Sequence, residues 1–353
     1  MNFCQPSYAK VVIPAKERKD MSTKATNQYQ FYRTAESVSP KHPDKLCDQI
    51  SDAILDAYLE QDPNSRVAAE TCGGHGVVFV TGEITSKGDV DIEKIVHRIA
   101  GDDIEVHTKI VKQSPEIAQG VDTGGAGDQG IMIGYATDET EELLPREVVL
   151  SRHLNEFIYN KYPYDGKTQV TIAPDGSIDS IVASFQNVSK TELEKLVKDF
   201  IKKNDLKGAQ ESSIELHINP AGDWHQGGFD ADTGLTGRKL IVDNYGPRIA
   251  IGGGCYSGKD ATKVDRSAAY MARKIAVDYL KKRHAHEVLV RLAYAIGKAE
   301  PLEQTVIIDG QPEEIKGYNL TPKGIIEFLN LRRPIYEETA KYGHYGHNFD
   351  WDK

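Results

Sequence analysis

Residues 252–263 have the composition of an anion-binding loop. Three consecutive glycines and Gly258 would let backbone N–H groups approach a charged ligand, and a helix predicted to start near Lys263 would add partial positive charge. Lys259, Lys263 and Arg266 add full positive charges. The alternative is a tight loop that needs glycine only for positive backbone angles. We favour phosphate binding because cations flank the glycines.

The same segment partly matches a P-loop, the phosphate-binding pattern G-x-x-x-x-G-K followed by Ser or Thr. Gly253, Gly258 and Lys259 fit this pattern, but Asp260 stands where a hydroxyl should bind magnesium. Only a short run, residues 248–251, precedes the glycines, whereas a P-loop follows a long buried strand. A P-loop is therefore the weaker interpretation.

A histidine and an aspartate mark the start of a helix predicted over residues 43–60. Asp44 would lie in the first turn, where the helix dipole favours a carboxylate, so it is either a helix-start acid or a ligand. His42 is either a cap or a catalytic group. Asp44 also begins a row of carboxylates at four-residue spacing, which we interpret as a solvated face rather than a metal ladder: Asp44, Asp48, Asp52 and Asp56.

Two further glycine-rich segments, residues 114–127 and 220–237, lead to charged side chains. Asp232 precedes Arg238 and Lys239, and arginine can bind an anion through two parallel hydrogen bonds. Trp224 offers a flat face for a base, although a lone tryptophan in a loop can equally serve packing. Asp128 follows a turn with almost no side chains, which favours a bound ligand. Because such segments cannot build a core, we place the ligand site there.

The elements that must hold these loops form a pattern that repeats three times. The first copy is predicted as strand 30–34, helix 43–60, strands 66–72 and 77–85, helix 91–100 and strand 105–112. The second is strand 130–137, helix 145–161, strands 168–173 and 177–186, helix 190–203 and strand 213–219. The third is strand 238–243, helix 264–282, strands 287–296 and 305–309, and helix 322–330.

Each unit is thus β-α-β-β-α, with a last strand in the first two copies, and its two helices can cover only one face of a mixed sheet. We therefore expect an α+β protein with three sheets packed around a shared centre, and an oligomer. The predicted parts are a flexible N-terminal extension (1–28), an N-terminal domain (29–113), a loop (114–127), a central domain (128–226) and a C-terminal domain (227–353).

Composition excludes several classes of protein. The chain of 353 residues has 53 acidic and 43 basic side chains, so its net charge of −10 disfavours nucleic acid and anionic membranes. No apolar run reaches the roughly 18 residues of a membrane helix. The first thirty residues hold no secretory-type segment, and Cys4, Cys47, Cys72 and Cys255 form no C-x-x-C pair. We expect a cytoplasmic protein without disulfides or zinc.

Together, four motifs resemble the S-adenosylmethionine synthase family. They are His42-Pro43-Asp44-Lys45, then Gly125-Ala126-Gly127-Asp128-Gln129-Gly130, then Gly234-Leu235-Thr236-Gly237-Arg238-Lys239, and last Ser257-Gly258-Lys259-Asp260 with Lys263-Val264-Asp265-Arg266. They occur in the family's order, and the resemblance extends from about Thr34 to Trp351. It implies three similar β-α-β-β-α-β domains around a pseudo-threefold axis.

The resemblance also implies an activity, that of a methionine adenosyltransferase. Such an enzyme joins ATP and L-methionine, then hydrolyses the bound triphosphate to phosphate and diphosphate. A thioether sulfur carries no proton, so its attack on C5′ of ATP needs no general base. The departing triphosphate must instead be stabilised by cations. The resemblance implies two Mg²⁺ ions and K⁺ at each site, and a homodimer or homotetramer with active sites at the subunit interface.

Site residues follow by resemblance, position by position. Catalytic roles fall on His42, at the bridging oxygen of the triphosphate, and on Lys167, Arg238 and Lys259. ATP would also contact Asp128, Asp165, Trp224, Asp232, Lys239 and Cys255. Methionine would be bound by Glu83, Gln113, Asp232 and Lys263. Mg²⁺ would be held by Asp44 and Asp265, and K⁺ by Glu70. Residues 114–127 match a mobile gate.

The chain departs from the family pattern near the site. Lys41 replaces a glycine before His42, Asp223 an arginine before Trp224, and Cys255 an alanine. The gate loop is also shorter. These departures bear on nucleotide preference, on the gate and on oligomeric state. Two alternatives remain open at this point: a P-loop phosphotransferase, and a non-catalytic nucleotide-binding relative of the family.

Overall fold

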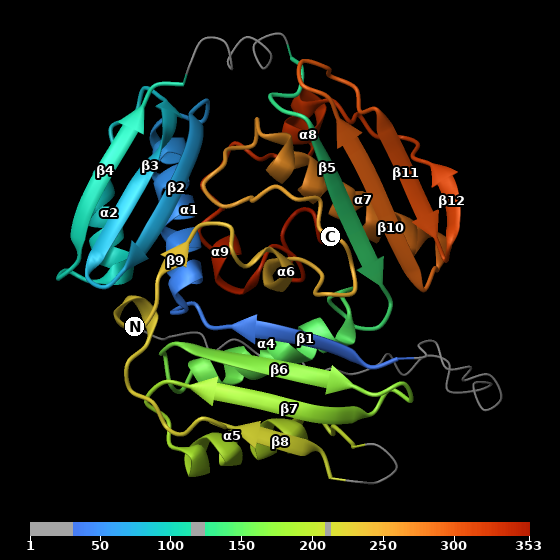
Figure 1. Ribbon diagram of the computed structural model, residues 1–353. Helices are drawn as coiled ribbons and strands as arrows, with labels where there is room; N and C mark the ends of the chain where they lie inside the picture. Colours follow the sequence, from blue (N-terminus) through green and yellow to red (C-terminus); the bar gives the residue numbers. More distant parts are fainter. Residues whose placement is uncertain (1–30, 114–123, 209–212) are drawn as a thin grey trace, which may run out of the picture.

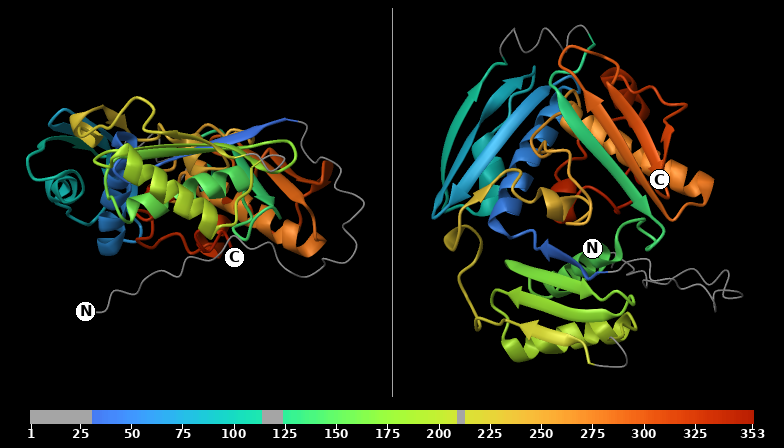
Figure 2. Two further views of the ribbon diagram at one scale, coloured as in Figure 1. Left: turned by 90° about the horizontal axis from the view of Figure 1, so that it is seen from below. Right: turned by 45° about the vertical axis from the view of Figure 1, so that its right-hand side comes forward.

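The computed structural model describes residues 31–113, 124–208 and 213–353. Three four-stranded sheets lie as the sides of a triangle (Figure 1). Seen edge-on, the molecule is flat, with the sheets on one side and the longer helices on the other (Figure 2). We call the side of the sheets away from the helices the open face. The predicted N-terminal extension, and residues 114–123 of the predicted gate, lie outside the described residues.

The first sheet has the strand order β4-β3-β2-β9. Strands β2 and β3 form a tight hairpin because His75 and Gly76 both adopt positive φ, 53° and 82°, as a two-residue turn requires. Helix α1 packs on β2 through a buried stripe that includes Ile50 and Ile54. The elements are α1 (Pro43–Gln61), β2 (Arg66–Gly74), β3 (Val77–Thr85), α2 (Ile92–Ala100), β4 (Glu105–Val111) and β9 (Gly234–Leu235).

The second sheet has the order β1-β6-β7-β8. Alternation along β6 turns the Thr168 hydroxyl toward the Ser151 carbonyl of α4, and leaves Lys167 on the open face. Ser189 begins α5 by accepting a hydrogen bond from the Glu192 N–H. The elements are β1 (Arg33–Val38), α4 (Arg146–Tyr159), β6 (Gly166–Ile172), β7 (Ile178–Phe185), α5 (Lys190–Lys203) and β8 (Glu215–Ile218).

The third sheet has the order β12-β11-β10-β5 and packs on the longest helix, α7. Gly134 of β5 permits this close contact, because a Cβ there would lie 2.1 Å from the backbone of Ala272. The elements are β5 (Gly130–Thr137), α7 (Val264–Arg283), β10 (Glu287–Tyr294), β11 (Glu303–Ile308), β12 (Gln311–Glu314) and α8 (Pro322–Phe328).

The three units exchange strands. Strand β1, which opens the first repeat, pairs with β6 of the second. Strand β5, which opens the second, pairs with β10 of the third. Strand β9 comes after the second repeat and pairs with β2 of the first. Each sheet therefore takes one strand from another part of the chain, and the three units close into a ring (Figure 1).

The strand predicted over residues 238–243 is wrong. Residues Leu240–Asp243 form the short helix α6, and the edge of the first sheet is instead taken by β9. The apolar Leu-Ile-Val run suggested a strand, but the Asp243 carboxylate faces α1 and binds the Lys45 ammonium at 2.7 Å. Two more short helices complete the fold, η2 (Gly228–Asp230) and α9 (Thr339–Tyr342).

Two hydrophobic cores underlie the sheets. One spans the units of the first and third sheets, and the other lies under the second. The C-terminal segment joins the larger core, where the fully buried Trp351 stacks on Tyr270 with ring centres 3.8 Å apart. In the part of the chain that the structure describes, every helix is too short or too polar to cross a bilayer.

Candidate active site

His42 caps helix α1 and is buried. Its Nδ1 atom accepts a hydrogen bond from the Asp44 N–H at 3.1 Å, so the proton of the neutral ring is assigned to Nε2. Burial lowers the pKa of His42 to about 3, and the positive charges of Lys239 and Lys167 act in the same direction. His42 is therefore a neutral hydrogen-bond donor surrounded by cations, which suits contact with an anionic oxygen.

Asp44, fully buried, joins α1 to the segment that follows β9. It binds the Lys239 ammonium at 2.5 Å and the Arg238 guanidinium at 3.0 Å, and it accepts the Leu235 N–H at 2.9 Å. Burial alone would raise the pKa of Asp44, but the bonds from Lys239 and Leu235 outweigh it and the pKa is lowered. We call His42, Asp44, Lys167, Arg238 and Lys239 the histidine group.

Residues 224–228, which we call the tryptophan segment, lie beside this group on the second sheet. Trp224 donates its indole N–H to Ser184 at 3.1 Å, and Ser184 pairs directly with Lys167 in the neighbouring strand. Asp165, two residues before Lys167, accepts the Gly228 N–H at 3.0 Å and closes the other end of the segment. Burial raises the pKa of Asp165. The predicted adenine-binding and phosphate-binding side chains are thus brought together.

Lys259 extends the first sheet. It pairs with Ala68 of β2 as an isolated antiparallel bridge, and Ala68 in turn pairs with Glu83 of β3. Glu70 lies one step further along the same face, where burial raises its pKa, Lys259 opposes the rise and Glu83 adds to it. The Lys259 ammonium also binds Asp265 at 3.1 Å. We call Glu70, Glu83, Lys259 and Asp265 the loop group.

The remaining predicted residues lie around the two groups, and Asp232 lies beside Asp165 on the side of the histidine group. Lys263 caps α7 with its backbone and pairs through its side chain with Asp260. Cys255 lies between the two groups, with its sulfur close to Gly237 on one side and its thiol near Glu70 and Lys259 on the other. Burial raises the pKa of this thiol. Asp128 and Asp232 are exposed, and each accepts the N–H of the next residue. Gln113 has a buried side-chain oxygen without a hydrogen-bond partner among the described residues.

The P-loop alternative is wrong. Residues 246–257 contain no strand, so the glycines do not connect a buried parallel strand to a helix. Helix α7 begins at Val264, after Lys259 has already paired with β2. The glycines instead allow close packing. At Gly258, for example, φ is 78° and a Cβ would lie 2.0 Å from the Ala69 carbonyl oxygen.

The carboxylate row on α1 is not a solvated face. Asp44, Asp48 and Asp52 are almost fully buried, and the four carboxylates accept N–H groups from three distant segments of the chain. The N–H groups of Leu235, Gly237 and Gly258 donate to Asp44, Asp48 and Asp52, respectively. Asp56 holds both Tyr336 and Glu337. The four-residue spacing signalled one helix face, but the chain segments that dock on it come from far away in sequence.

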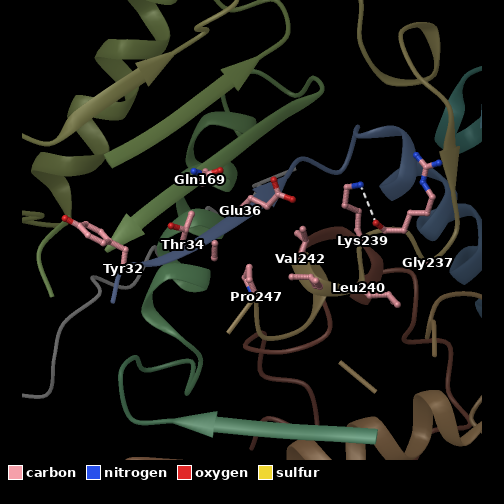
Figure 3. A pocket seen from close by; sticks show the side chains of 13 residues that line it. Tyr32, Thr34, Glu36, Gln169, Gly237, Lys239, Leu240, Val242 and Pro247 are labelled. Carbon is pink, nitrogen blue, oxygen red and sulfur yellow. Dashed lines mark hydrogen bonds between the residues drawn. The ribbon is translucent and has the colours of Figure 1, made fainter. Parts of the chain in front are cut away.

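A cavity opens beside the histidine group, and Figure 3 shows its lining. It has a volume of about 740 Å³ and lies between strands β1 and β6 and the segment after Gly237. Lys239 stands at one end, while Tyr32, Thr34 and Gln169 line the other (Figure 3). Both groups and this cavity reach the open face, but among the described residues no hydrogen bond or ion pair joins the two groups.

Three similar sheets, with cations gathered around carboxylates on their open face, define a protein suited to a polyanionic ligand. Family models described as the N-terminal, central and C-terminal domains of S-adenosylmethionine synthetase match residues 30–115, 123–224 and 226–353. Proteins named S-adenosylmethionine synthase are similar over most of their length. The one from Clostridium tetani is 45% identical, over 89% of this chain and 93% of the relative.

Corresponding proteins from Brachyspira hyodysenteriae and Thermus thermophilus are 42% and 43% identical, over 92% and 91% of this chain and 96% and 95% of their own lengths. The chain belongs to the S-adenosylmethionine synthase family. The predicted family, the three-unit α+β fold and the predicted enzyme class, a methionine adenosyltransferase, are thereby confirmed. Membership is also consistent with dependence on metal ions.

Proposed function

We propose that the chain forms S-adenosylmethionine by direct attack of the methionine sulfur on C5′ of ATP. The C5′–O bond breaks, its electron pair leaves with the triphosphate, and water then splits the triphosphate into phosphate and diphosphate. The observation that carries the proposal is the histidine group, where Arg238 and Lys239 bind one carboxylate and Lys167 lies near a neutral histidine. Such a group stabilises a departing polyanion. It offers no general base, but the attack of a thioether sulfur on C5′ does not require one.

Within that group, each side chain has a part in binding the triphosphate. Lys167, Arg238 and Lys239 are positioned for its oxygens, and Lys259 adds a fourth cation from the loop group. The Nε2–H of His42 would donate to the oxygen that leaves C5′. For the nucleoside, Trp224 offers a face for adenine, and the predicted contacts are Asp128, Asp165, Asp232 and Cys255.

Methionine would bind at the loop group. Its ammonium needs carboxylates, and two exposed side chains would supply them where the subunit contact brings the groups together: Glu83 of the loop group and Asp232 beside the histidine group. Its carboxylate needs a cation, which Lys263 can supply. The unpartnered oxygen of Gln113 would accept a hydrogen bond from the ammonium. The neutral thioether itself requires only space.

The carboxylates suit Mg²⁺ that arrives with the phosphates. Mg²⁺ is commonly bound by one or two carboxylates together with phosphate oxygens and water, rather than by a protein cage. Asp44 and Asp265 fit this chemistry. Two glycines keep the surroundings of Asp265 open, because a Cβ at Gly254 or Gly130 would lie 2.2 Å or 3.4 Å from its Oδ1 atom. Bound Mg²⁺ would neutralise charge on the leaving group, and Glu70 would hold K⁺.

The open face supports a homodimer, alone or as half of a homotetramer, with active sites between subunits. Phe79, Cys72 and Leu235 lie directly opposite one another across three strands of the first sheet. Phe79 is 50% exposed and Leu235 39%, and Ile131 of the third sheet is 52% exposed. Apolar side chains on a sheet face without helices are typical of a subunit contact.

Synthesis itself is tested with ATP, L-methionine, Mg²⁺ and K⁺, by chromatographic detection of S-adenosylmethionine. The proposal predicts product that depends on methionine. A folded protein that gives no product above background would falsify it. Binding of both ATP and methionine without turnover would favour a non-catalytic relative instead.

A further inference from the structure

Asp52 and Arg266 form a buried ion pair directly behind the loop that carries Lys259. Both side chains are 0% exposed, and the guanidinium binds the two carboxylate oxygens at 2.6 and 2.9 Å. Neither side chain reaches the open face. We propose that this pair is a positioning device, which fixes the Lys259 backbone and so the ammonium that binds the triphosphate. The inference rests on the proposed function.

The pair holds the loop from both sides of Lys259. Asp52 accepts the Gly258 N–H at 2.8 Å, and Arg266 donates to the carbonyls of Tyr256 and Lys259 at 2.9 and 3.1 Å. On the opposite side, the loop is hydrogen-bonded to β2, through Gly258 to Ala69 at 3.0 Å and through Asp260 to Val67. The Lys259 backbone is thus held between the Asp52–Arg266 ion pair on one side and strand β2 on the other.

Arg266 couples Lys259 to Asp265, its neighbour in the sequence. Asp265 and Arg266 lie in the first turn of α7, so a guanidinium anchored to Asp52 fixes where this turn stands relative to the loop. The Lys259 ammonium and the Asp265 carboxylate then meet at 3.1 Å. The cation and the proposed Mg²⁺ ligand of the loop group are therefore placed by one buried side chain.

Stability alone does not account for such a pair. Desolvation of two charges commonly cancels their attraction, and a well-packed apolar pair is often as stable. Only the charged pair provides several hydrogen-bond donors in a fixed geometry. The Arg266 guanidinium also donates to Thr339 and Tyr270, at 3.0 and 3.1 Å. Its position is over-determined, as a group that aligns a catalytic cation requires.

The same helix supplies a matched control. Arg273 is also 0% exposed, pairs with Asp352 at 3.0 Å, and donates to the carbonyls of Tyr135, Leu143 and Glu142. None of these partners lies in the two groups. Arg266→Lys and Arg273→Lys therefore make the same change in comparable surroundings, one behind Lys259 and one away from it.

The experiment compares these variants in the full chain. Inorganic tripolyphosphate is the ligand in titration calorimetry, turnover is measured with ATP and methionine, and thermal unfolding reports stability. We expect both variants to unfold at lower temperature. Only Arg266→Lys should weaken tripolyphosphate binding by about tenfold or more and lower kcat by up to about 100-fold. Asp52→Asn provides a second variant with the same expected pattern if Arg266→Lys does not fold.

A double-mutant cycle with Lys259→Ala shows whether Arg266 acts through Lys259. If it does, Arg266→Lys should weaken tripolyphosphate binding no further once Lys259 is gone. Equal weakening with and without Lys259, or equal loss of affinity in the Arg273→Lys control, would overturn the proposal.

Hydrogen exchange separates this proposal from the proposed function, because it needs no substrate. The Gly258 and Lys259 amides should lose protection in Arg266→Lys and keep it in Arg273→Lys. Unchanged protection in both overturns the positioning role, even if the enzyme makes S-adenosylmethionine. Lost protection in Arg266→Lys, with no product from the wild-type protein, overturns the proposed function alone.

Discussion

The Oδ2 atom of Asp44 and the Nζ atom of Lys239 lie 2.5 Å apart, in an ion pair between the start of α1 and the segment after β9. This pair sets the charge balance of the histidine group before a ligand arrives. A triphosphate that binds there competes with Asp44 for Lys239, and a metal ion at Asp44 would free the lysine to bind phosphate. In the proposed function, the carboxylate would therefore hold the cation before the ligand binds and release it afterwards.

Asp44→Asn should lower kcat by roughly 100-fold or more, because the group loses its only negative charge while it keeps the acceptor for the Leu235 N–H. Asp56→Asn is the control. It changes the same residue type on the same helix face, but at a position that holds Tyr336 and Glu337. Steady-state kinetics should show lower turnover in Asp44→Asn alone. Wild-type turnover in Asp44→Asn would remove this carboxylate from the mechanism.

Subunit sharing can be tested by mixing two inactive variants. Asp44→Asn disables the histidine group and Asp265→Asn the loop group. If each active site takes one group from each subunit of a two-fold dimer, one of the two sites in every mixed dimer is intact, and purified mixed dimers should show about half of wild-type activity. The measurement is the activity of mixed dimers purified through two different tags. Activity no higher than that of the separate variants would place both groups of a site in one subunit.

The imidazole of His42 should remain neutral across the physiological range. Burial, helped by Lys239 and Lys167, lowers its pKa to about 3 in the folded protein, whereas an unfolded histidine titrates near 6.5. Below about pH 6.5, His42 therefore takes up a proton in the unfolded state but not in the folded state. The free energy of unfolding falls as the pH is lowered from about 6.5 toward 3.

Two measurements check this prediction for His42. The NMR signal of its ring should not titrate between pH 8 and 5. The free energy of unfolding should fall less steeply with acidification in His42→Asn than in the wild-type protein, since other buried histidines are common to both. A His42 signal that titrates near pH 6.5 would contradict the assignment of a neutral donor.

Trp224 should contribute to ATP binding through its aromatic face. Stacking on a base is worth about 1–3 kcal/mol, so Trp224→Ala should raise the KM for ATP by about tenfold or more. Trp224→Phe keeps a face but loses the bond to Ser184, and it should retain most of the affinity. The KM for methionine should stay constant in both variants. Equal KM values for ATP in wild type and Trp224→Ala would assign the tryptophan to packing.

Local patterns sufficed to predict many elements of this fold. The period of four along α1, the glycine hairpin at His75-Gly76 and the strand over residues 130–137 are all present as predicted. Each depends on residues close in sequence. The exchange of β1, β5 and β9 between units depends on pairing across long stretches of chain, and β-strand patterns do not specify their partners.

Parts of the candidate site were beyond sequence reasoning for a similar reason. Motifs identified the charged side chains, but not that they divide into two groups. The carboxylate row was visible as a spacing, yet its burial depends on which loops dock against it. The sequence presents Arg266 as one of several cations near the glycine loop, whereas its guanidinium is fully buried against Asp52. A row of acids on a helix whose other side chains are mostly apolar is the signal that could have revealed such docking.

The most direct test of the account follows the oxygen that joins C5′ of ATP to the α-phosphorus. ATP labelled with ¹⁸O at this position is incubated with methionine, Mg²⁺ and K⁺, and all products are analysed by mass spectrometry. Attack of sulfur on C5′ predicts that the label leaves with the phosphate products and that S-adenosylmethionine carries none. Label that stays on the adenosine product would mean cleavage of a P–O bond, and would contradict the account.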